Sequence, residues 1–443
     1  MAAHPEVAVV GGGMLGLTLA LRLAEDGVRV SVLEAEATAG GLAAPDTIGG
    51  FQWDRFYHVM LMSDLNLRRL VADLGLGESV HWKQTRTGFY GDGRLHSLSS
   101  SLDFARFPLL SLPDKARLAA TILRASRVRN PLPLEQEPVE AWLRRWSGNR
   151  VVDRVWLPLL KSKLGDNYRI ASAAFIWAII ARMYAARRSG LKKEMFGYVE
   201  GGYARVITAL RERLGKLGVQ FERQARVVDV SGGGGSATIR LADGRVLSAA
   251  QVVLTLPCST IAQVCPWLTV AERERLDSVV YQGIICASVL LRRPLAGYYV
   301  TNIVDDGIPF TGVIEMTALV DPATFGGHSL VYLPRYLAQD DPAWDQDDAQ
   351  LSAAFLAGLR RMYPDLDASE VIDLRIARAR QVLAVSTLDY SRRCLPAFET
   401  SAPNVFVANS AQIAQGTLNV NETIAVAESA ARMLTAGSAR VAA

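Results

Sequence analysis

Cysteine is scarce in this sequence of 443 residues, and its four cysteines show no CxxC spacing. Cys258, Cys265, Cys286 and Cys394 therefore predict packed thiols in a reducing compartment, and they argue against a disulfide framework or a metal centre. No apolar run reaches the roughly 18 uninterrupted residues of a membrane-spanning helix. The nearest one, residues 170–186, contains Arg182 and predicts a buried helix instead.

A strong charge imbalance is missing as well. The net charge of +4 is small for the length, and no basic run is interleaved with aromatic residues, so nucleic acid is not an expected partner. Residues 1–6 are too short and too polar for a signal peptide, which predicts a cytoplasmic protein. With 50% hydrophobic residues the chain can bury a large core, and its length suggests two or three domains. A small molecule is the expected partner, and the oligomeric state stays open.

The most informative stretch lies near the N-terminus. A short β-branched run at residues 7–10 leads into Gly11-Gly12-Gly13-Met14-Leu15-Gly16, a helix-like segment and a second apolar run. This order predicts a βαβ unit with a dinucleotide-binding turn. Gly11 permits the tight turn, Gly13 lets the backbone approach a pyrophosphate, and Gly16 lets the helix pack on the strand. The free N–H groups at the start of the helix favour phosphate.

The second apolar run ends at Glu34, which follows Gly16 by 18 residues. This is close to the spacing of about 20 residues expected for an acid that accepts hydrogen bonds from ribose hydroxyls. A carboxylate at this position disfavours a 2′-phosphate, so NADP is not expected. Without the flanking strands and the acid, the glycines would fit an ordinary α/β turn equally well.

Glu34 is followed by Ala35 and, a few residues later, by Gly40-Gly41-Leu42. A βαβ unit that ends in Glu and precedes Gly-Gly resembles the FAD-binding signature of a large flavoprotein group. That group includes amine oxidases, protoporphyrinogen oxidases, phytoene desaturases and UDP-galactopyranose mutases. The resemblance implies FAD as cofactor, with the Gly-Gly turn beside its pyrophosphate and flavin. Amine oxidases usually carry a basic residue after Gly-Gly, and Leu42 in that place lowers the case for amine oxidation.

Two later segments resemble other parts of the same FAD site. Val228 matches a valine whose main chain contacts the adenine. Residues 403–410 predict a buried strand, followed by a loop and by an alanine-rich helix from about Ile424. In the family, the turn before that helix points N–H groups at the flavin. The resemblance therefore implies a cofactor-binding set of Gly11, Gly13, Met14, Leu15, Gly16, Glu34, Ala35, Gly40, Gly41, Leu42, Val228, Asn409, Asn421, Glu422 and Thr423.

Residues 51–64 resemble a segment of the UDP-galactopyranose mutases that carries a histidine to the flavin, and His58 is the matching position. A histidine beside aromatic residues also suits a structural hydrogen bond. Residues 309–315 resemble a mutase segment in which an arginine holds the diphosphate of a UDP-sugar. Gly312 replaces that arginine, which argues against a UDP-sugar bound in the mutase manner. The candidate catalytic residues are His58, Tyr332, Arg335 and Glu315, with Tyr336 nearby; a structural role is the alternative for each.

Two basic segments have open interpretations. Residues 104–129 mix arginines with Leu, Phe and Ile, which fits a peripheral membrane contact, a grip on an anionic substrate, or a helical cap with a solvated basic face. Lys161 and Lys163 face either a phosphate or carboxylate, or solvent.

Together these patterns predict an α/β fold with two domains. A discontinuous Rossmann-like FAD-binding domain is expected from residues 1–50, 200–260 and 400–437. A mixed α+β substrate domain, built on an antiparallel sheet, is expected from residues 51–199 and 261–399.

The expected function is that of an FAD-dependent oxidoreductase. It would transfer hydride from a small organic or lipid/sugar-like substrate to flavin, as an oxidase, dehydrogenase or desaturase. The alternative is a redox-neutral, flavin-dependent mutase or isomerase acting on a sugar or lipid-linked compound. A non-enzymatic role, as in GDP-dissociation inhibitors of the same fold, is opposed by the intact Gly-Gly and C-terminal motifs.

Overall fold

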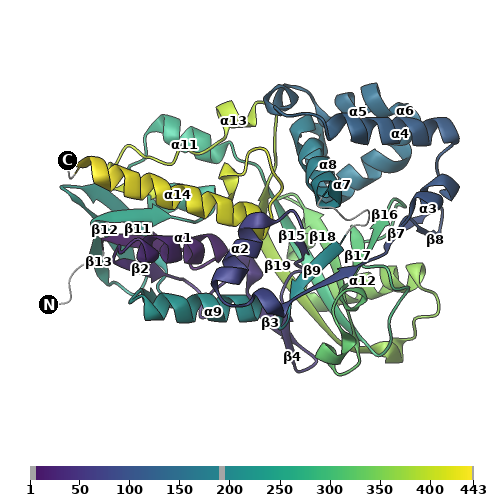
Figure 1. The fold of residues 1–443 in the computed structure, drawn as a ribbon, viewed down its shortest axis with the longest axis horizontal. Helices are drawn as coiled ribbons and strands as arrows, with labels where there is room; N and C mark the ends of the chain where they lie inside the picture. Colours follow the sequence, from purple (N-terminus) through teal and green to yellow (C-terminus); the bar gives the residue numbers. More distant parts are fainter. Residues whose placement is uncertain (1–5, 189–194, 442–443) are drawn as a thin grey trace.

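The computed structural model describes residues 6–188 and 195–441, which form a mixed α/β fold. Figure 1 shows a parallel sheet with its covering helices at the left, a helical layer at the upper right and a larger sheet at the lower right. The parallel sheet has the strand order β10-β2-β1-β14-β20. Its strands are β10 (Gln220–Glu222), β2 (Val30–Leu33), β1 (Val7–Val10), β14 (Gln251–Leu254) and β20 (Val405–Val407). Three separate segments of the chain therefore meet in one sheet.

Helices cover one face of the parallel sheet because their apolar sides share a core with it. They are α1 (Met14–Glu25), α2 (Leu65–Asp73), α9 (Gly202–Lys216) and α14 (Val420–Val441). The other face packs against a smaller antiparallel sheet and short helices. These are β11 (Val227–Gly233), β12 (Ser236–Leu241), β13 (Val246–Ala249), α10 (Cys258–Val264), α11 (Val270–Asp277) and α13 (Tyr390–Arg393). Burial on both faces explains why β1 is a continuous apolar run and why β2 is apolar except at Ser31.

The larger sheet has seven strands in the order β19-β15-β18-β17-β16-β7-β8. Their bounds are β19 (Val371–Ala384), β15 (Tyr281–Leu291), β18 (Ser329–Leu337), β17 (Gly312–Glu315), β16 (Val300–Ile303), β7 (Thr87–Gly91) and β8 (Arg94–Ser97). All pairs are antiparallel except β16 with β7. Helix α12 (Asp348–Met362) packs on one face. The other face carries the aromatic cluster described below.

Two small sheets connect the halves of the molecule. One pairs β3 (Pro45–Ile48) with β4 (Phe51–Asp54), and the other has the order β5-β9-β6. The bounds of the latter strands are β5 (Met60–Leu61), β9 (Met195–Val199) and β6 (Val80–Gln84).

A helical layer lies above the larger sheet (Figure 1). It contains α3 (Ser101–Arg106), α4 (Leu112–Ala125), α5 (Val139–Ser147), α6 (Asn149–Val151), α7 (Leu157–Leu164) and α8 (Ala173–Arg188). The buried helix predicted at residues 170–186 corresponds to α8 and begins three residues later. No helix within the described residues has both the length and the apolar composition needed to cross a bilayer.

The domain boundaries expected from the sequence do not follow the hydrophobic cores everywhere. Helix α2 packs with α1 and α14 against the parallel sheet, although its residues were assigned to the substrate domain. Helices α10 and α11 likewise share a core with β11 and β14. Which core receives the buried side chains of a helix is a tertiary property that its position in the sequence does not specify.

The packing of α1 on the glycine turn is tight enough to test. A Cβ added to Gly16 would lie 1.9 Å from the Gly11 carbonyl oxygen. Gly16→Ala is therefore expected to lower the free energy of unfolding by about 1–3 kcal/mol through overpacking, measured by denaturant titration. Gly215→Ala is the matched control, because a Cβ at this helical glycine of α9 meets no atom within 4 Å. Equal stability of the two variants would contradict the close approach of α1 to the turn.

Candidate active site

The first glycine turn leaves the start of α1 as bare backbone. Gly11 has a φ of +112°, a conformation that favours glycine. Gly13 is the N-cap residue of α1 and contributes no side-chain hydrogen bond. No acidic side chain lies in the first turn of the helix. The N–H groups that open a helix have no acceptor within it, so this turn offers free donors to an anion.

Glu34 lies at the end of β2 and is almost completely buried, with 8% of its surface exposed. One of its carboxylate oxygens accepts a hydrogen bond from the Gly12 N–H at 2.7 Å, and the other accepts from the Glu36 N–H at 2.8 Å. Each oxygen retains a second lone pair, which is the acceptor capacity that sugar hydroxyls require. Ala35 follows directly in the turn. The carboxylate is thus fixed over the glycine turn by backbone donors.

The second glycine turn lies against the first. Gly40 and Gly41 both have positive φ angles, +118° and +58°. The Gly40 N–H donates to the Gly12 carbonyl at 2.8 Å, and Gly13 and Gly40 form a parallel bridge. A Cβ on Gly41 would lie 3.3 Å from the Gly13 Cα. The two turns therefore face each other with backbone only, as a cradle for a pyrophosphate requires.

The start of α14 completes this region. Helix α14 begins at Val420, four residues before the predicted start at Ile424. Asn419 provides the cap, because its Oδ1 accepts a hydrogen bond from the Glu422 N–H at 3.0 Å. Met14 and Leu15 of α1 lie in the same buried cluster as Val420. Two helix N-termini, each a source of partial positive charge, thus lie close to the glycine turns.

Other members of the predicted cofactor set have structural contacts of their own. The Asn421 Oδ1 accepts hydrogen bonds from the N–H groups of Asn66 and Leu67, so it caps α2. The Asn409 side chain bonds to the Ala411 N–H and the Leu256 carbonyl. The Thr423 hydroxyl donates to the Asn419 carbonyl. For these residues, only main-chain groups are left as the evident route to a cofactor.

Val228 sits at a bulge near the other end of the cradle. A register shift between Val227 and Asp229 leaves Val228 without a partner residue in β12, and 43% of its surface is exposed. The chain enters β11 beside Glu34, because the Ala225 N–H donates to the Glu34 carbonyl at 2.8 Å. This placement agrees with a position at the adenine end of a dinucleotide that Glu34 holds by its ribose.

His58 lies in the connection between β4 and β5. Its Nδ1 is 2.8 Å from the Phe56 carbonyl oxygen, and its ring packs on Tyr203 with the centroids 4.9 Å apart. Burial lowers the pKa of His58 to about 4, so the ring is neutral at neutral pH. Because a carbonyl only accepts, Nδ1 carries the proton and Nε2 keeps a lone pair. Within the described residues, Nε2 has no hydrogen-bond partner.

Asp54 lies next to His58, with its Oδ2 3.8 Å from the histidine Nδ1. Its Oδ1 accepts a hydrogen bond from the Tyr203 N–H at 2.8 Å, which joins β4 to the start of α9. Burial raises the pKa of Asp54 to about 7, although the Tyr203 hydrogen bond opposes the shift. The carboxyl is therefore mostly neutral below pH 7, so Asp54 and His58 do not form a permanent ion pair, and the hydrogen bond of this junction is the one between the Tyr203 N–H and Asp54.

Three side chains from separate elements converge beside this junction. The hydroxyls of Tyr57 and Tyr336 are 2.8 Å apart, and the Lys163 ammonium lies 3.6 Å from the centre of the Tyr336 ring. Leu42, directly after the second glycine turn, packs against the same hydrophobic cluster as both tyrosines. Lys163 is half-buried and has no carboxylate partner within the described residues. Burial lowers its pKa to about 7.

The remaining catalytic candidates are placed differently. Tyr332 lies on the same face of β18 as Tyr336, and its hydroxyl donates to the Asp54 carbonyl. Arg335 precedes Tyr336 on β18, so its side chain points to the opposite face, where it pairs with Asp341 at 3.5 Å. Glu315 is buried and accepts hydrogen bonds from the Leu295 and Gly297 N–H groups. The structure thus brings His58 and Tyr332 together and leaves Arg335 and Glu315 apart from them.

The sequence of the chain matches a known family over most of its length. The matched family is described as flavin containing amine oxidoreductase, and the match covers residues 15–434. The chain belongs to this family. The prediction of a flavin cofactor, FAD, is confirmed at this level, and the glycine cradle described above fits such a cofactor without any substitution that would block it.

Individual relatives agree with this assignment. Coproporphyrinogen III oxidase of Propionibacterium freudenreichii subsp. freudenreichii is 26% identical over an alignment of 329 positions, with coverage of 61% of this chain and 61% of the relative. The crystal structure of a putative protoporphyrinogen oxidase from Exiguobacterium sp. 255-15 has 19% identity, a TM-score of 0.77, and coverage of 98% of this chain and 99% of the other. Reduced UDP-galactopyranose mutase has 16% identity, a TM-score of 0.74, and coverage of 97% and 96%. The two structures establish the likeness of fold.

The chain spans only part of its curated relatives. The matches cover 33%, 61% and 56% of three oxidases that act on porphyrinogens by name. The family match and these relatives confirm the resemblance to the flavoprotein group that the Gly-Gly motif indicated. Because the coverage is partial, the relatives do not establish the substrate or the activity of this chain.

Sequence reasoning did not identify three residues that organise this flavoprotein site: Asp54, Tyr57 and Asn419. A signal for Asn419 exists, because Asn at 419 and Glu at 422 have the spacing of a capping box. Asp54 and Tyr57 carry no such signal. Their importance comes from contacts with Tyr203 and Tyr336, which are 149 and 279 positions away in the chain.

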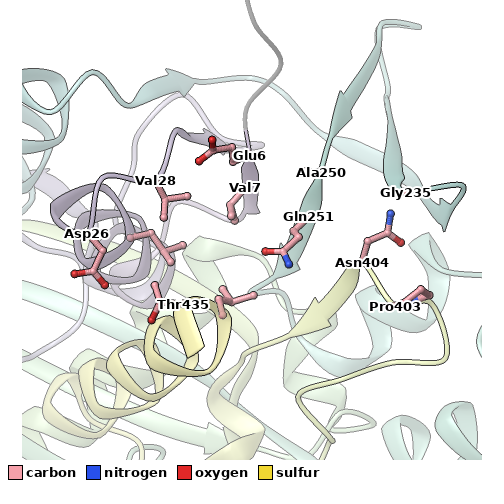
Figure 2. A pocket seen from close by; sticks show the side chains of 12 residues that line it. Glu6, Val7, Asp26, Val28, Gly235, Ala250, Gln251, Pro403, Asn404 and Thr435 are labelled. Atoms are coloured by element: carbon pink, nitrogen blue, oxygen red, sulfur yellow. The ribbon is translucent and has the colours of Figure 1, made fainter. Parts of the chain in front are cut away.

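A separate cavity of about 710 Å³ lies at the amino ends of the strands of the parallel sheet (Figure 2). It is lined by Val7 and Gln251, which begin β1 and β14, and by Asn404, which precedes β20. The glycine turns lie at the carboxyl ends of these strands, where ligands of parallel sheets bind. The cavity in Figure 2 is therefore distinct from the flavin cradle.

The cradle separates cofactor binding from folding in a way that can be tested. The Gly13 backbone is extended, and a Cβ on it would meet no atom closer than the Gly41 Cα at 3.9 Å. Gly13→Val should leave the thermal stability of the cofactor-free protein unchanged and weaken FAD binding at least about tenfold, because the side chain fills the pyrophosphate position. FAD titration of cofactor-free protein measures this. Normal flavin affinity in the variant would contradict the assignment of the turn.

Proposed function

We propose that this protein is an FAD-dependent oxidoreductase that takes hydride from a carbon of a small organic or lipid/sugar-like substrate. The observation that carries the proposal is the junction of the glycine cradle with the polar cluster of His58, Tyr57, Tyr336 and Lys163. Leu42 follows the second glycine turn, and Leu42, Tyr57 and Tyr336 all pack against the same hydrophobic cluster, which includes Trp53 and Phe56. When bound, FAD supplies the hydride acceptor, and the protein supplies binding and orientation.

The proposal includes a division of labour between the two halves of the fold. The parallel-sheet half would hold FAD, with Glu34 at the ribose, the two glycine turns at the pyrophosphate and the start of α14 near the flavin. The half built on the seven-stranded sheet would hold the substrate. Asp54 supports this division, because it is bonded to α9 of the first half through its side chain and to β18 of the second through its carbonyl.

Lys163 supports a substrate with an anionic group. A half-buried ammonium without a carboxylate partner in the described residues favours a carboxylate or phosphate beside it. It disfavours a cationic amine, because two positive charges over the same tyrosine ring repel each other. This agrees with Leu42, which stands where amine oxidases usually have a basic residue.

His58 would act through Nε2. Its Nδ1–H is held by the Phe56 carbonyl, so the free lone pair of Nε2 can accept a hydrogen bond or a proton from the substrate. The neighbouring tyrosines would remain protonated, because burial raises the pKa of Tyr57 to about 12 and raises the pKa of Tyr336 well above its ordinary value. They can therefore donate hydrogen bonds and cannot serve as bases near neutral pH.

A second candidate function is a redox-neutral mutase or isomerase acting on a sugar or lipid-linked compound. The His58 segment and the fold of reduced UDP-galactopyranose mutase favour it. Gly312 weighs against a UDP-sugar, because it provides no guanidinium for the diphosphate. It is buried on β17, where a Cβ would make a tight contact of 3.1 Å with the Thr301 carbonyl oxygen. Turnover that requires a reductant without consuming it would favour this candidate over the first.

The role of His58 is tested by His58→Ala. The variant should retain FAD, because His58 makes no contact with either glycine turn, and flavin reduction should slow about a hundredfold. Stopped-flow bleaching of the flavin absorbance, with substrates found in a metabolite screen, measures the rate. His81→Ala is the control, since His81 is an exposed histidine of β6. Unchanged reduction kinetics in His58→Ala would return His58 to a structural role.

The proposed contact between Lys163 and an anionic group of the substrate is tested with the variant Lys163→Met. Its KM is compared for a carboxylic acid substrate and for the methyl ester of that acid. The loss of a charged hydrogen bond should raise KM for the acid about tenfold or more and leave KM for the ester unchanged. In the native enzyme, KM for the acid should rise as pH increases through about 7, because Lys163 then loses its proton. Equal effects on acid and ester would refute the assignment without affecting the FAD site.

A further inference from the structure

Helix α4 has two apolar faces, of which only one is buried. The inner face, which includes Leu118, Thr121 and Ala125, packs into the helical layer. It is anchored by a hydrogen bond of 2.9 Å between the Thr121 and Ser147 hydroxyls. This packing sets the rotation of α4 about its own axis, so the same side chains always face outward.

The outer face of α4 is a stripe of apolar side chains. Leu112 is 75% exposed and Leu123 is 40% exposed. They are 11 positions apart, which is three turns of an α-helix, so they lie on one line. Ala116, Ala119 and Ala120 lie between them and are also exposed. We refer to Leu112, Ala116, Ala119, Ala120 and Leu123 as the α4 stripe.

Further exposed leucines lie close to the α4 stripe in the chain. Leu102, on the adjoining helix α3, is 56% exposed, and Leu132, after the end of α4, is 50% exposed. Four of the ten large hydrophobic side chains that are exposed in the described residues thus fall between positions 102 and 132. A concentration of this kind marks an interaction surface more often than scattered single residues do.

Positive charge is concentrated in the same segment. Residues 101–130 contain six basic and two acidic side chains, a surplus of four that equals the net charge of the whole chain. The two acids are engaged locally: Asp103 accepts hydrogen bonds from Ser97 and Ser99, and Asp114 is buried beside Ser111. The side chains of Arg106, Arg127 and Arg129 form no ion pair within the described residues. Their charge is therefore available to an anionic surface.

From these observations we propose that the α4 stripe and its flanking arginines form a docking surface for an anionic lipid bilayer. Leucines on one line would enter the boundary between head groups and acyl chains, while arginines beside them contact lipid phosphates. The contact is peripheral, because no helix of the described chain can span a bilayer. The surface lies on the helical layer, at the far end of the molecule from the parallel sheet (Figure 1).

The proposal is tested with the purified full-length protein and sedimenting vesicles. Vesicles of phosphatidylcholine with phosphatidylglycerol should bind the protein, and binding should weaken at high ionic strength because the arginine contacts are screened. Vesicles of phosphatidylcholine alone should bind at least about tenfold less. Equal binding to both compositions, or no binding to either, would overturn the proposal.

Matched variants separate this surface from general stickiness. The double variant Leu112→Glu, Leu123→Glu should lose binding at least about tenfold. Val246→Glu, Val270→Glu is the control, because these valines are 63% and 73% exposed on the parallel-sheet half. Flavin content and thermal stability verify folding in both. Unchanged vesicle binding in the leucine variant would overturn the proposal. A second contradicting result would be a native dimer that the leucine substitutions dissociate, because a second copy of the chain would then cover the α4 stripe.

Discussion

The contact between the two glycine turns is the constraint on which the rest of the structure depends. Gly12 and Gly40 share a backbone hydrogen bond, and Gly13 and Gly41 approach without any side chain between them. A Cβ on Gly13 would leave this approach intact but would occupy the space that a pyrophosphate needs. The Glu34 carboxylate fixes the same turn from the side of β2. Strand, helix and both turns are thus positioned by backbone groups, which hold their geometry more rigidly than long side chains.

Asp54 connects this cradle to the chemistry proposed beside it. Its side chain accepts from α9 and its carbonyl accepts from Tyr332 of β18, so one residue joins both halves of the fold. The same residue lies beside His58, whose ring it helps to enclose. A buried carboxyl in this position carries a desolvation cost, which the raised pKa expresses. Because Asp54 joins the two halves and also lies beside His58, substitutions at Asp54 are expected to change both stability and activity.

The helical layer gives the protein features that the cofactor site does not require. Lys163 comes from α7 of this layer, and the α4 stripe lies on its outer side. The two features face different surroundings: the Lys163 ammonium lies over the ring of Tyr336, whereas Arg106, Arg127 and Arg129, which flank α4 in the chain, are exposed. In the two proposals made above, positive charge has separate roles in one layer, substrate recognition at the inside and docking at the outside.

The sequence by itself determined the nucleotide-binding end of this protein. The order of apolar run, glycine turn, helix and acid is local, and local spacing dictates backbone geometry directly, so the roles of Gly11, Gly13 and Glu34 in a dinucleotide site could be predicted. The flavin cofactor and the role of Gly40 and Gly41 were implied by the resemblance to a flavoprotein signature. The start of α14 was predicted less accurately, because its cap is Asn419, several residues before the predicted start at Ile424.

Only the tertiary structure decided which polar residues meet. Arg335 and Tyr336 are neighbours in sequence, yet alternation along β18 sends their side chains to opposite faces. Tyr57, Lys163 and Tyr336 are far apart in sequence, yet they converge. The substrate side of the site is built from long-range contacts between separate elements, and such contacts leave no periodicity or spacing in the sequence from which they could be read.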